Sequence, residues 1–282
     1  MTVRNDRPQF EAEVTAVSRV SPHMVRVALG GIRGLDGSRM PEGGVSDEFF
    51  GLWVPGAGAD ALNGRVKRYY TVRRRRADAG ELDVDLLLHG TGPATEWAAR
   101  AAVGDVVMFD SPRGHYAPPS DSTRLVLCGD ATALPAIGRM LEERAEQDSS
   151  PPASILIALD DRADAQLLPI RPGDDLCWCS PKDLVAGVRS RIGDDSRSYV
   201  WFSGEAADMR AVRAMLRREL NIPTARWMTM GYWRRDSERW SARFEAAGPE
   251  LRIAIDEVLS SSVDDETQSD LLEELLAARG LL

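Results

Sequence analysis

A change of pattern near residue 120 constrains the fold of this chain more than any other sequence feature. Before that point, apolar and polar residues alternate in short segments separated by Gly, Pro and Asp: FEAEVTAVSRV, HMVRVALGG, DEFFGLWV and ELDVDLLLHG. Beyond it, strand patterns such as RLVLCGD, PPASILIALD and SYVWFSGE alternate with helical patterns such as ALPAIGRMLEERAEQ and ADMRAVRAMLRREL. Short strands joined by turns are typical of an antiparallel barrel or sandwich, whereas alternating strands and helices predict a parallel sheet.

The pattern therefore predicts a two-domain protein, β followed by α/β, and 282 residues suffice for two cores. The Pro-rich passage at Pro118 and Pro119 marks the natural boundary. We predict a first domain over residues 1–119, a second over residues 120–240, and an acidic tail over residues 241–282. Within the tail, a Ser-rich linker is expected to precede one short amphipathic helix, DLLEELLAARGLL, which docks onto the body or onto a dimer partner.

The charge distribution excludes whole classes of partner. The net charge is −9, and residues 241–282 hold ten Asp or Glu against three Arg, so the body is almost balanced. A nucleic-acid partner would require a strongly basic surface, and none is expected. No apolar run reaches the roughly 20 residues needed to span a bilayer, and MTVRNDRPQF lacks the apolar core of a secretory signal. We therefore expect a cytoplasmic protein with no membrane insertion.

Cysteine usage argues against a metal held by the protein. The chain has three cysteines, too few for the four thiolates of an iron–sulfur cluster. Cys177 and Cys179 are separated by one residue, and we expect two strand residues that face opposite ways. Cys128 lies in the apolar run LVLC and is expected to be a small buried side chain. No metal ligands are predicted, so a metal would arrive within the substrate.

The segment RYYTVR, residues 68–73, supplies an aromatic ring, a hydroxyl and guanidinium groups on one short strand. A flavin dinucleotide needs this mixture, because the isoalloxazine stacks on an aromatic face, its rim forms hydrogen bonds, and its diphosphate attracts cations. A basic and aromatic strand is weak evidence alone. Its value depends on the segments that follow.

Three later turn segments strengthen the flavin hypothesis. HGTGPATEWA opens a helix directly after a strand, where free N–H groups favour phosphate and Thr91 and Thr95 add hydroxyl donors. CGDATALP and WFSGE each end a buried strand, at the edge where open α/β sheets bind ligands. CGDATALP is not the GxGxxG fingerprint of a standard dinucleotide site. Turn chemistry explains each glycine separately, but the four segments in this order form a much sharper pattern.

Together these segments resemble those of the siderophore-interacting proteins, bacterial flavoproteins related to the ferredoxin–NADP reductases. The resemblance rests on SPHMVRVALGG, RYYTVR, LDVDLLLHG with GPATEWA, GDVVMFDSPRG, CGDATALPAIGRML, SGEAADMRAVRAMLR and GYWR. It implies an N-terminal antiparallel FAD-binding β-barrel, a C-terminal parallel-sheet NAD(P)H-binding domain, and FAD between them. The implied activity is reduction of ferric siderophores by NADPH or NADH through FAD, with release of Fe(II).

The resemblance also implies roles for individual residues. Tyr70 would lie against the isoalloxazine, Arg68 would bind phosphate, and Thr71 with the backbone of Val72 and Arg73 would complete the flavin strand. The pyrophosphate and adenine would be enclosed by His89, Gly92, Pro93, Ala94 and Thr95, although His89 could instead be a packed histidine at a strand end. The pyridine nucleotide would be faced by Asp130, Thr132, Ala133, Pro135, Gly204 and Glu205. No catalytic residue is implied, because the cofactor carries the chemistry.

Substrate capture is expected to rest on cations near the flavin edge, because many ferric siderophores are anionic. The candidates are Arg74, Arg75, Arg76, Arg234 and Arg235, each of which could equally be a solvated loop arginine. Two alternatives stay open: a generic NAD(P)H-dependent flavin or ferredoxin-type reductase with another acceptor, and a non-catalytic siderophore-binding protein. A ferredoxin-like electron donor also stays open as a partner.

Overall fold

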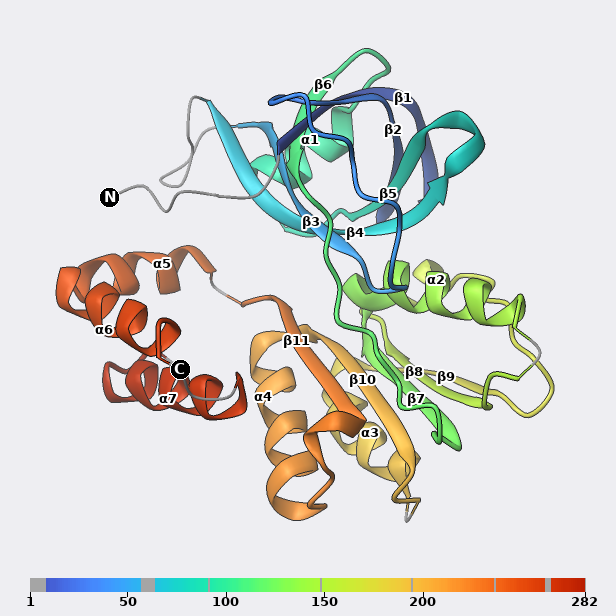
Figure 1. The fold of residues 1–282 in the computed structure, drawn as a ribbon, viewed down its shortest axis with the longest axis vertical. Helices are drawn as coiled ribbons and strands as arrows, with labels where there is room; N and C mark the ends of the chain where they lie inside the picture. Colours follow the sequence, from blue (N-terminus) through green and yellow to red (C-terminus); the bar gives the residue numbers. More distant parts are fainter. Residues whose placement is uncertain are drawn as a thin grey trace.

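The structure is a computed structural model that describes residues 9–56, 64–90, 92–147, 149–193, 195–235, 237–261 and 265–281. A β-barrel lies above a parallel sheet flanked by helices, and the C-terminal helices lie beside the sheet (Figure 1). The predicted fold class is therefore confirmed. The barrel strands end at Asp110 and the sheet begins at Arg124, while the domain limits at residues 119 and 240 stay predictions.

The barrel consists of antiparallel strands that close in the order β1-β2-β5-β4-β3-β6. These strands are β1 (Gln9–Ser21), β2 (Met24–Gly34), β3 (Phe49–Pro55), β4 (Arg65–Arg76), β5 (Glu81–Leu87) and β6 (Val106–Asp110). Alternate side chains point inward, and Phe109 packs against Phe10 and Phe50 with ring centroids 5.4 and 4.8 Å apart. Helix α1 (Pro93–Arg100) adds Trp97 to the same core.

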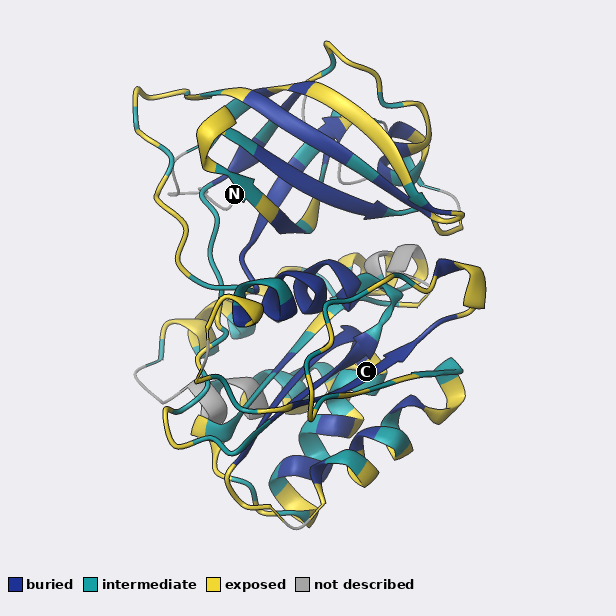
Figure 2. Cartoon of the chain, turned by 90° about the vertical axis from the view of Figure 1, so that its right-hand side faces the viewer, coloured by how far each residue is buried: buried dark blue, intermediate teal, exposed yellow. Residues whose placement is uncertain are grey.

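The second unit is a parallel sheet in the order β11-β10-β7-β8-β9. Its elements are β7 (Arg124–Asp130), α2 (Leu134–Ala145), β8 (Ala153–Ala158), β9 (Asp175–Cys179), α3 (Leu184–Ile192), β10 (Ser198–Glu205), α4 (Ala206–Ala214) and β11 (Trp227–Trp233). Leu125 and Leu127 of β7 pack on the α2 side, whereas Val126 and Cys128 pack on the α3 and α4 side. Because both faces are covered, the central strands are buried along their length (Figure 2).

The two cysteines of β9 lie on one face of the strand, so the expectation of opposite faces was wrong. Side chains alternate along a strand, and residues two apart therefore face the same way. Trp178, between them, packs toward the α2 side, while Cys179 packs toward the α3 side. Cys128 is buried as predicted, and burial raises the pKa of its thiol to about 12.

The described part of the tail holds three helices where the sequence predicted one: α5 (Ser237–Ala246), α6 (Pro249–Leu259) and α7 (Asp265–Ala278). Helix α7 contains most of the predicted amphipathic segment and begins inside the expected linker. Glu273 of α7 pairs with Arg213 of α4 at 3.3 Å, so the helix docks onto the body of the chain. None of the helices in the described ranges is long and apolar enough to cross a bilayer.

Partly buried ion pairs and hydrogen bonds hold α2 against the barrel strand β4. Arg73 donates two hydrogen bonds to Glu142, at 2.8 and 2.6 Å, and Arg139 donates to the Val72 carbonyl at 3.0 Å. Burial alone would raise the pKa of Glu142, but Arg73 and Arg74 lower it to about 2. These contacts fix the position of the barrel relative to the sheet.

Candidate functional site

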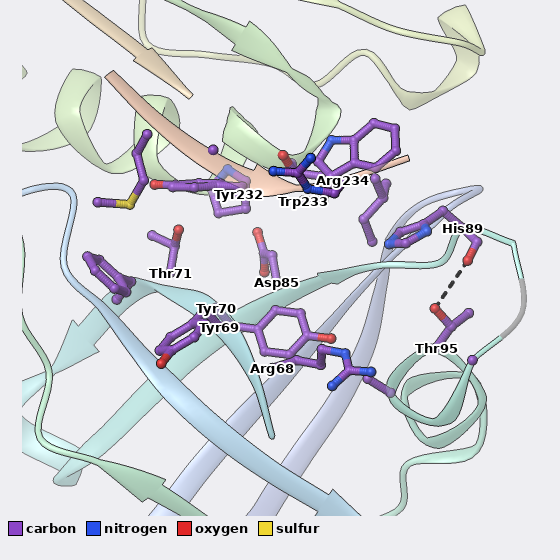
Figure 3. Close-up of a pocket in the computed structure, with 18 of the residues that line it drawn as sticks. Arg68, Tyr69, Tyr70, Thr71, Asp85, His89, Thr95, Tyr232, Trp233 and Arg234 are labelled. Carbon is purple, nitrogen blue, oxygen red and sulfur yellow. Dashed lines mark hydrogen bonds between the residues drawn. The ribbon is translucent and has the colours of Figure 1, made fainter. Parts of the chain in front are cut away.

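A cavity of about 660 Å³ lies where the barrel meets the sheet (Figure 3). Its barrel side is formed by β4, the end of β5 and the start of α1. Its sheet side is formed by the turn after β7 and by β11. Cofactor sites commonly have volumes of about 300–1,000 Å³, so the cavity has the size of a cofactor site.

Strand β4 brings the predicted flavin residues to the cavity wall. Arg68, Tyr70 and Thr71 all line it, and Figure 3 shows Arg68 and Tyr70 together on the barrel side. Burial raises the pKa of Tyr70 to about 12, so its phenol keeps its proton at neutral pH. The neighbouring Tyr69 is 54% exposed and meets the Phe49 ring edge to face, with centroids 6.1 Å apart.

The start of α1 forms the next part of the wall. His89, Gly92, Pro93, Ala94 and Thr95 line the cavity there, while Thr91 lies outside the described residues. The Thr95 hydroxyl donates to the His89 carbonyl at 3.3 Å, which ties the helix start to the end of the preceding strand. The His89 ring lies 6.1 Å from the ring of Trp233, so the barrel and the sheet meet across this end of the cavity.

Asp130 organises the sheet side from behind the cavity wall. Its carboxylate accepts hydrogen bonds from the Thr132 N–H at 2.8 Å, the Thr132 hydroxyl at 2.5 Å, the Glu205 N–H at 2.9 Å and Trp233 Nε1 at 2.7 Å. Burial raises the pKa of Asp130, and these donors oppose the rise. Glu205 caps α4 and accepts from the Arg235 N–H at 3.0 Å. Both carboxylates are thus engaged inside the protein.

The cavity wall carries three guanidinium groups, those of Arg68, Arg113 and Arg234. The carboxylate of Asp85, also in the wall, accepts two hydrogen bonds from Arg26 at 2.6 and 2.8 Å, which balances its charge. The Arg113 guanidinium lies over the rings of Phe49 and Tyr69, at 4.4 and 5.3 Å from their centroids. Its buried Nη1 lies 3.8 Å from the Asp110 carboxylate and forms no hydrogen bond with any described residue. The wall is therefore positive and has an unused donor.

The candidate substrate arginines of β4 are held away from the cavity. Arg74 pairs with Glu142 at 3.1 Å, Arg75 with Glu48 at 2.8 Å, and Arg76 with Asp83 at 2.7 Å. Among the five candidates, Arg234 alone is in the wall as the described residues define it.

The structure brings together about half of the residues predicted for the site. The predicted residues in the wall are Arg68, Tyr70, Thr71, His89, Gly92, Pro93, Ala94, Thr95, Thr132, Pro135 and Arg234. Those outside the described wall are Val72, Arg73, Arg74, Arg75, Arg76, Asp130, Ala133, Gly204, Glu205 and Arg235. The ligand contacts assigned to both sets stay predictions.

Sequence reasoning missed several wall residues, among them Tyr69, Arg113, Tyr232 and Trp233. The segments SPRG and GYWR contain three of them, and both contributed to the resemblance without a role being assigned to their side chains. Tyr69 stands inside RYYT, where the resemblance assigned roles to Arg68, Tyr70 and Thr71 only.

The wall residues fit a flavin dinucleotide. No side chain caps the start of α1, and Gly92 there has a φ of 155°. A Cβ at Gly92 would meet no atom within 4 Å, so open space adjoins the free N–H groups, and a phosphate can approach them. Arg68 adds a cation and Tyr70 an aromatic face beside the same space.

A closed barrel joined to a parallel sheet is the fold of the ferredoxin reductases, and the cavity between the two units has the size and the lining of a flavin site. Two family models define the chain more narrowly. The siderophore-interacting FAD-binding domain matches residues 60–116, and the siderophore-interacting protein model matches residues 122–236. The chain belongs to the siderophore-interacting protein family, and its cofactor is FAD.

Individual relatives agree with this membership. An uncharacterized protein of Mycobacterium tuberculosis is 30% identical over 272 residues, which cover 81% of this chain and 91% of the relative. The NADPH-dependent ferric-chelate reductase of Escherichia coli is 26% identical over 252 residues, covering 82% and 95%. The crystal structure of a siderophore utilization protein from T. fusca superposes with a TM-score of 0.67 at 29% identity, covering 81% and 93%.

Proposed function

We propose that this chain is an NADPH-dependent reductase of ferric siderophores that releases iron in the cytoplasm. The proposal rests on one observation. The residues of the barrel that are predicted to bind flavin line the same cavity as residues at the carboxyl ends of β7 and β11. The named activity of the E. coli relative supports both the electron donor and the ferric chelate.

The protein would bind and position, and the cofactor would carry the electrons. Bound FAD would supply the redox chemistry, which is acceptance of a hydride from the reduced nicotinamide and transfer of single electrons to Fe(III). Arg68 and the start of α1 would hold its diphosphate, and Tyr70 would lie against its ring system. Thr132 and Pro135, at the end of β7, would border the nicotinamide. Fe(II) binds siderophore oxygens less tightly than Fe(III), so reduction would loosen the chelate.

The outer end of the cavity offers a surface for an anionic ferric chelate. Arg113 lies there over the Tyr69 ring, and Lys67 Nζ lies 5.2 Å from the centroid of the same ring. Both cations face Asp110, but Lys67 is hydrogen-bonded to it at 2.7 Å, whereas Arg113 Nη1 lies 3.8 Å from the carboxylate and keeps a buried N–H without a described hydrogen-bond acceptor. Arg113 is therefore the cation that we assign to the substrate.

The test uses the full chain loaded with FAD under nitrogen. NADPH should bleach the yellow absorption, a ferric triscatecholate should restore it, and a ferrous chelator should record the Fe(II) formed. Flavin that bleaches but is not reoxidised by any ferric chelate would favour the generic reductase. A protein that cannot take up FAD would favour the non-catalytic binder.

Arg113→Ala should raise the Michaelis constant for the anionic triscatecholate about tenfold, the effect of one charge-assisted contact, with FAD content unchanged. A cationic ferric trihydroxamate should show no such increase. Arg252→Ala, on the exposed face of α6, is the control for loss of one positive charge. Equal constants for Arg113→Ala and wild type would contradict the substrate assignment alone.

A further inference from the structure

The C-terminal tail holds one cation of the cavity wall. Arg234 follows β11 and stands beside Trp233 on the sheet side of the cavity (Figure 3). Its guanidinium lies 4.7 Å from the centroid of the Trp240 ring of α5, and its Nη1 donates to the Leu281 carbonyl at 3.4 Å. An aromatic face and a carbonyl oxygen both attract a cation, so the tail restricts this side chain from behind.

The tail groups that hold Arg234 are themselves fixed. Trp240 Nε1 donates to the same Leu281 carbonyl at 2.7 Å, and its ring stacks on Phe244 with centroids 5.1 Å apart. Arg243 donates to the Gly280 carbonyl. Leu281 is 2% exposed, so its backbone is packed in place. The contact to Arg234 thus comes from an ordered cluster.

Helix α7 ends in a way that presents the Leu281 carbonyl. The Leu281 N–H donates to the Leu276 carbonyl and the Gly280 N–H donates to the Ala277 carbonyl, both at 2.8 Å. Gly280 has a φ of 63°, which glycine adopts without strain. These two bonds form the Schellman termination, which turns the chain back across the helix end. The ion pair between α7 and α4 then keeps the helix on the sheet domain.

The opposite wall indicates which ligand Arg234 meets. Figure 3 places Arg234 on the sheet wall and Arg68 on the barrel wall, with the start of α1 beside them. Guanidinium groups and an uncapped helix start around one space favour a phosphate. No carboxylate in the described ranges pairs with Arg234. Burial and the charge of Arg210 lower the pKa of Arg234, and the charge of Glu205 only partly opposes this, so an anionic ligand would add a favourable counter-charge.

We propose that Arg234 binds a phosphate of a dinucleotide in the cavity, and that the tail, through Trp240 and Leu281, is the positioning element that presents it. The proposal rests on the proposed function, since that function brings dinucleotides to this cavity. The family models end at residue 236, so these two tail residues lie outside the matched segments. FAD and NADPH share the diphosphate chemistry, and separate binding measurements distinguish them.

The first measurement compares dissociation constants without turnover. FAD is titrated into apoprotein by flavin fluorescence, and NADP⁺, which cannot reduce the flavin, is titrated into the FAD-loaded protein by the change in flavin absorption. Arg234→Ala should weaken one of the two about tenfold, the loss of one charge-assisted hydrogen bond. Riboflavin and nicotinamide riboside lack the diphosphate, and their binding should not change. Equal affinity for both dinucleotides in Arg234→Ala and wild type would overturn the proposal.

The second measurement tests whether the tail acts through Arg234. Trp240→Leu, and separately a chain ending at Gly280, should weaken the same dinucleotide about threefold to fivefold, whereas Trp240→Phe keeps a ring and should lie near wild type. In the Arg234→Ala background, Trp240→Leu should have no further effect. Additive effects, or wild-type affinity in Trp240→Leu and the shortened chain, would overturn the positioning role.

Control variants distinguish an effect of the tail on binding from a loss of folding and from a failure of the proposed function. Arg252→Ala removes one positive charge from the tail at a distance from Arg234 and should bind as wild type. Circular dichroism and thermal unfolding establish that each variant is folded, and Trp240→Phe provides a conservative replacement. Failure of the wild type to reduce ferric chelate would refute the proposed function, whereas an inert tail beside an active wild type would refute only this inference.

Discussion

At the residue scale, Asp130 shows how a strand-end carboxylate can shape a binding site without lining it. Its four donors come from the turn after β7, from the end of β10 and from the end of β11. The family resemblance assigned Asp130 to the pyridine nucleotide, and its segment ends a strand at the edge where open sheets bind ligands. The structure surrounds the carboxylate with protein donors, an arrangement that no local motif encodes because β10 and β11 are distant in sequence. The nucleotide contact itself stays a prediction.

Asp130→Asn should lower the free energy of unfolding by about 1–3 kcal/mol, because an amide NH₂ would face buried N–H and O–H donors. The variant should also release Trp233 Nε1 and so loosen the sheet wall. Chemical unfolding followed by circular dichroism measures the loss of stability. Asp36→Asn, in an exposed loop, is the matched control and should stay within about 0.5 kcal/mol of wild type. Equal stability of the Asp130 and Asp36 variants would contradict the central role of Asp130.

At the element scale, the sequence predicts a strand or helix well where burial produces a regular spacing of apolar residues. The apolar patterns identify β1 to β3 and β5, although β3 and β5 are buried at nearly every residue and not on one face alone. The segments RYYT and GPATEWA could be assigned because each holds its chemistry within one local element. Arg113 and Trp233 could not, because their places depend on pairing between distant strands. Helices α5 and α6 were not predicted, because the chain from residue 241 was described only as an acidic tail and the Ser-rich linker was placed after residue 259.

Gly280→Ala should open the end of helix α7, since a residue with a Cβ pays about 1–2 kcal/mol for the left-handed conformation that Gly280 holds. Amide hydrogen exchange in α7 should become faster about tenfold, while the unfolding of the barrel and sheet should not change. Gly44→Ala, in an open barrel loop, provides the comparison. If exchange in α7 is the same in both variants, the Schellman termination does not hold the tail in place.

At the scale of the whole molecule, the site exists because the barrel and the sheet are locked at a fixed distance. The ion pairs between α2 and β4 lie on one side of the contact between the barrel and the sheet domain, which we call the joint. Elsewhere Trp201 Nε1 donates to Asp47 at 3.1 Å, and the His23 ring contacts Asp164 at 2.8 Å. Each pair joins the barrel region to the sheet domain, so cavity shape and joint stability depend on the same contacts.

Glu142→Gln should destabilise the joint by about 1 kcal/mol at neutral pH, a modest value because the ion pair is partly exposed. The folded state lowers the pKa of Glu142 from its ordinary 4.5 to about 2, with burial opposed by Arg73 and Arg74. A lowered pKa means that the stabilisation is complete above pH 4.5 and is lost as the pH falls toward 2. The difference in unfolding free energy between variant and wild type should therefore shrink through this window.

The control for this titration is Glu250→Gln, an exposed change on α6 that should alter stability by less than about 0.5 kcal/mol. A gap between Glu142→Gln and wild type that persists undiminished in acid would show that the carboxylate charge is not what stabilises the joint.

The cavity wall begins with Met24 in the second strand and ends with Arg234, just after the last one. A ribosome delivers the barrel long before it delivers β11, and domains usually fold in the order of their synthesis. The nascent barrel therefore has only part of the wall to offer a flavin. We therefore expect the complete cavity to form, and cofactor loading to finish, only after translation has passed the sheet.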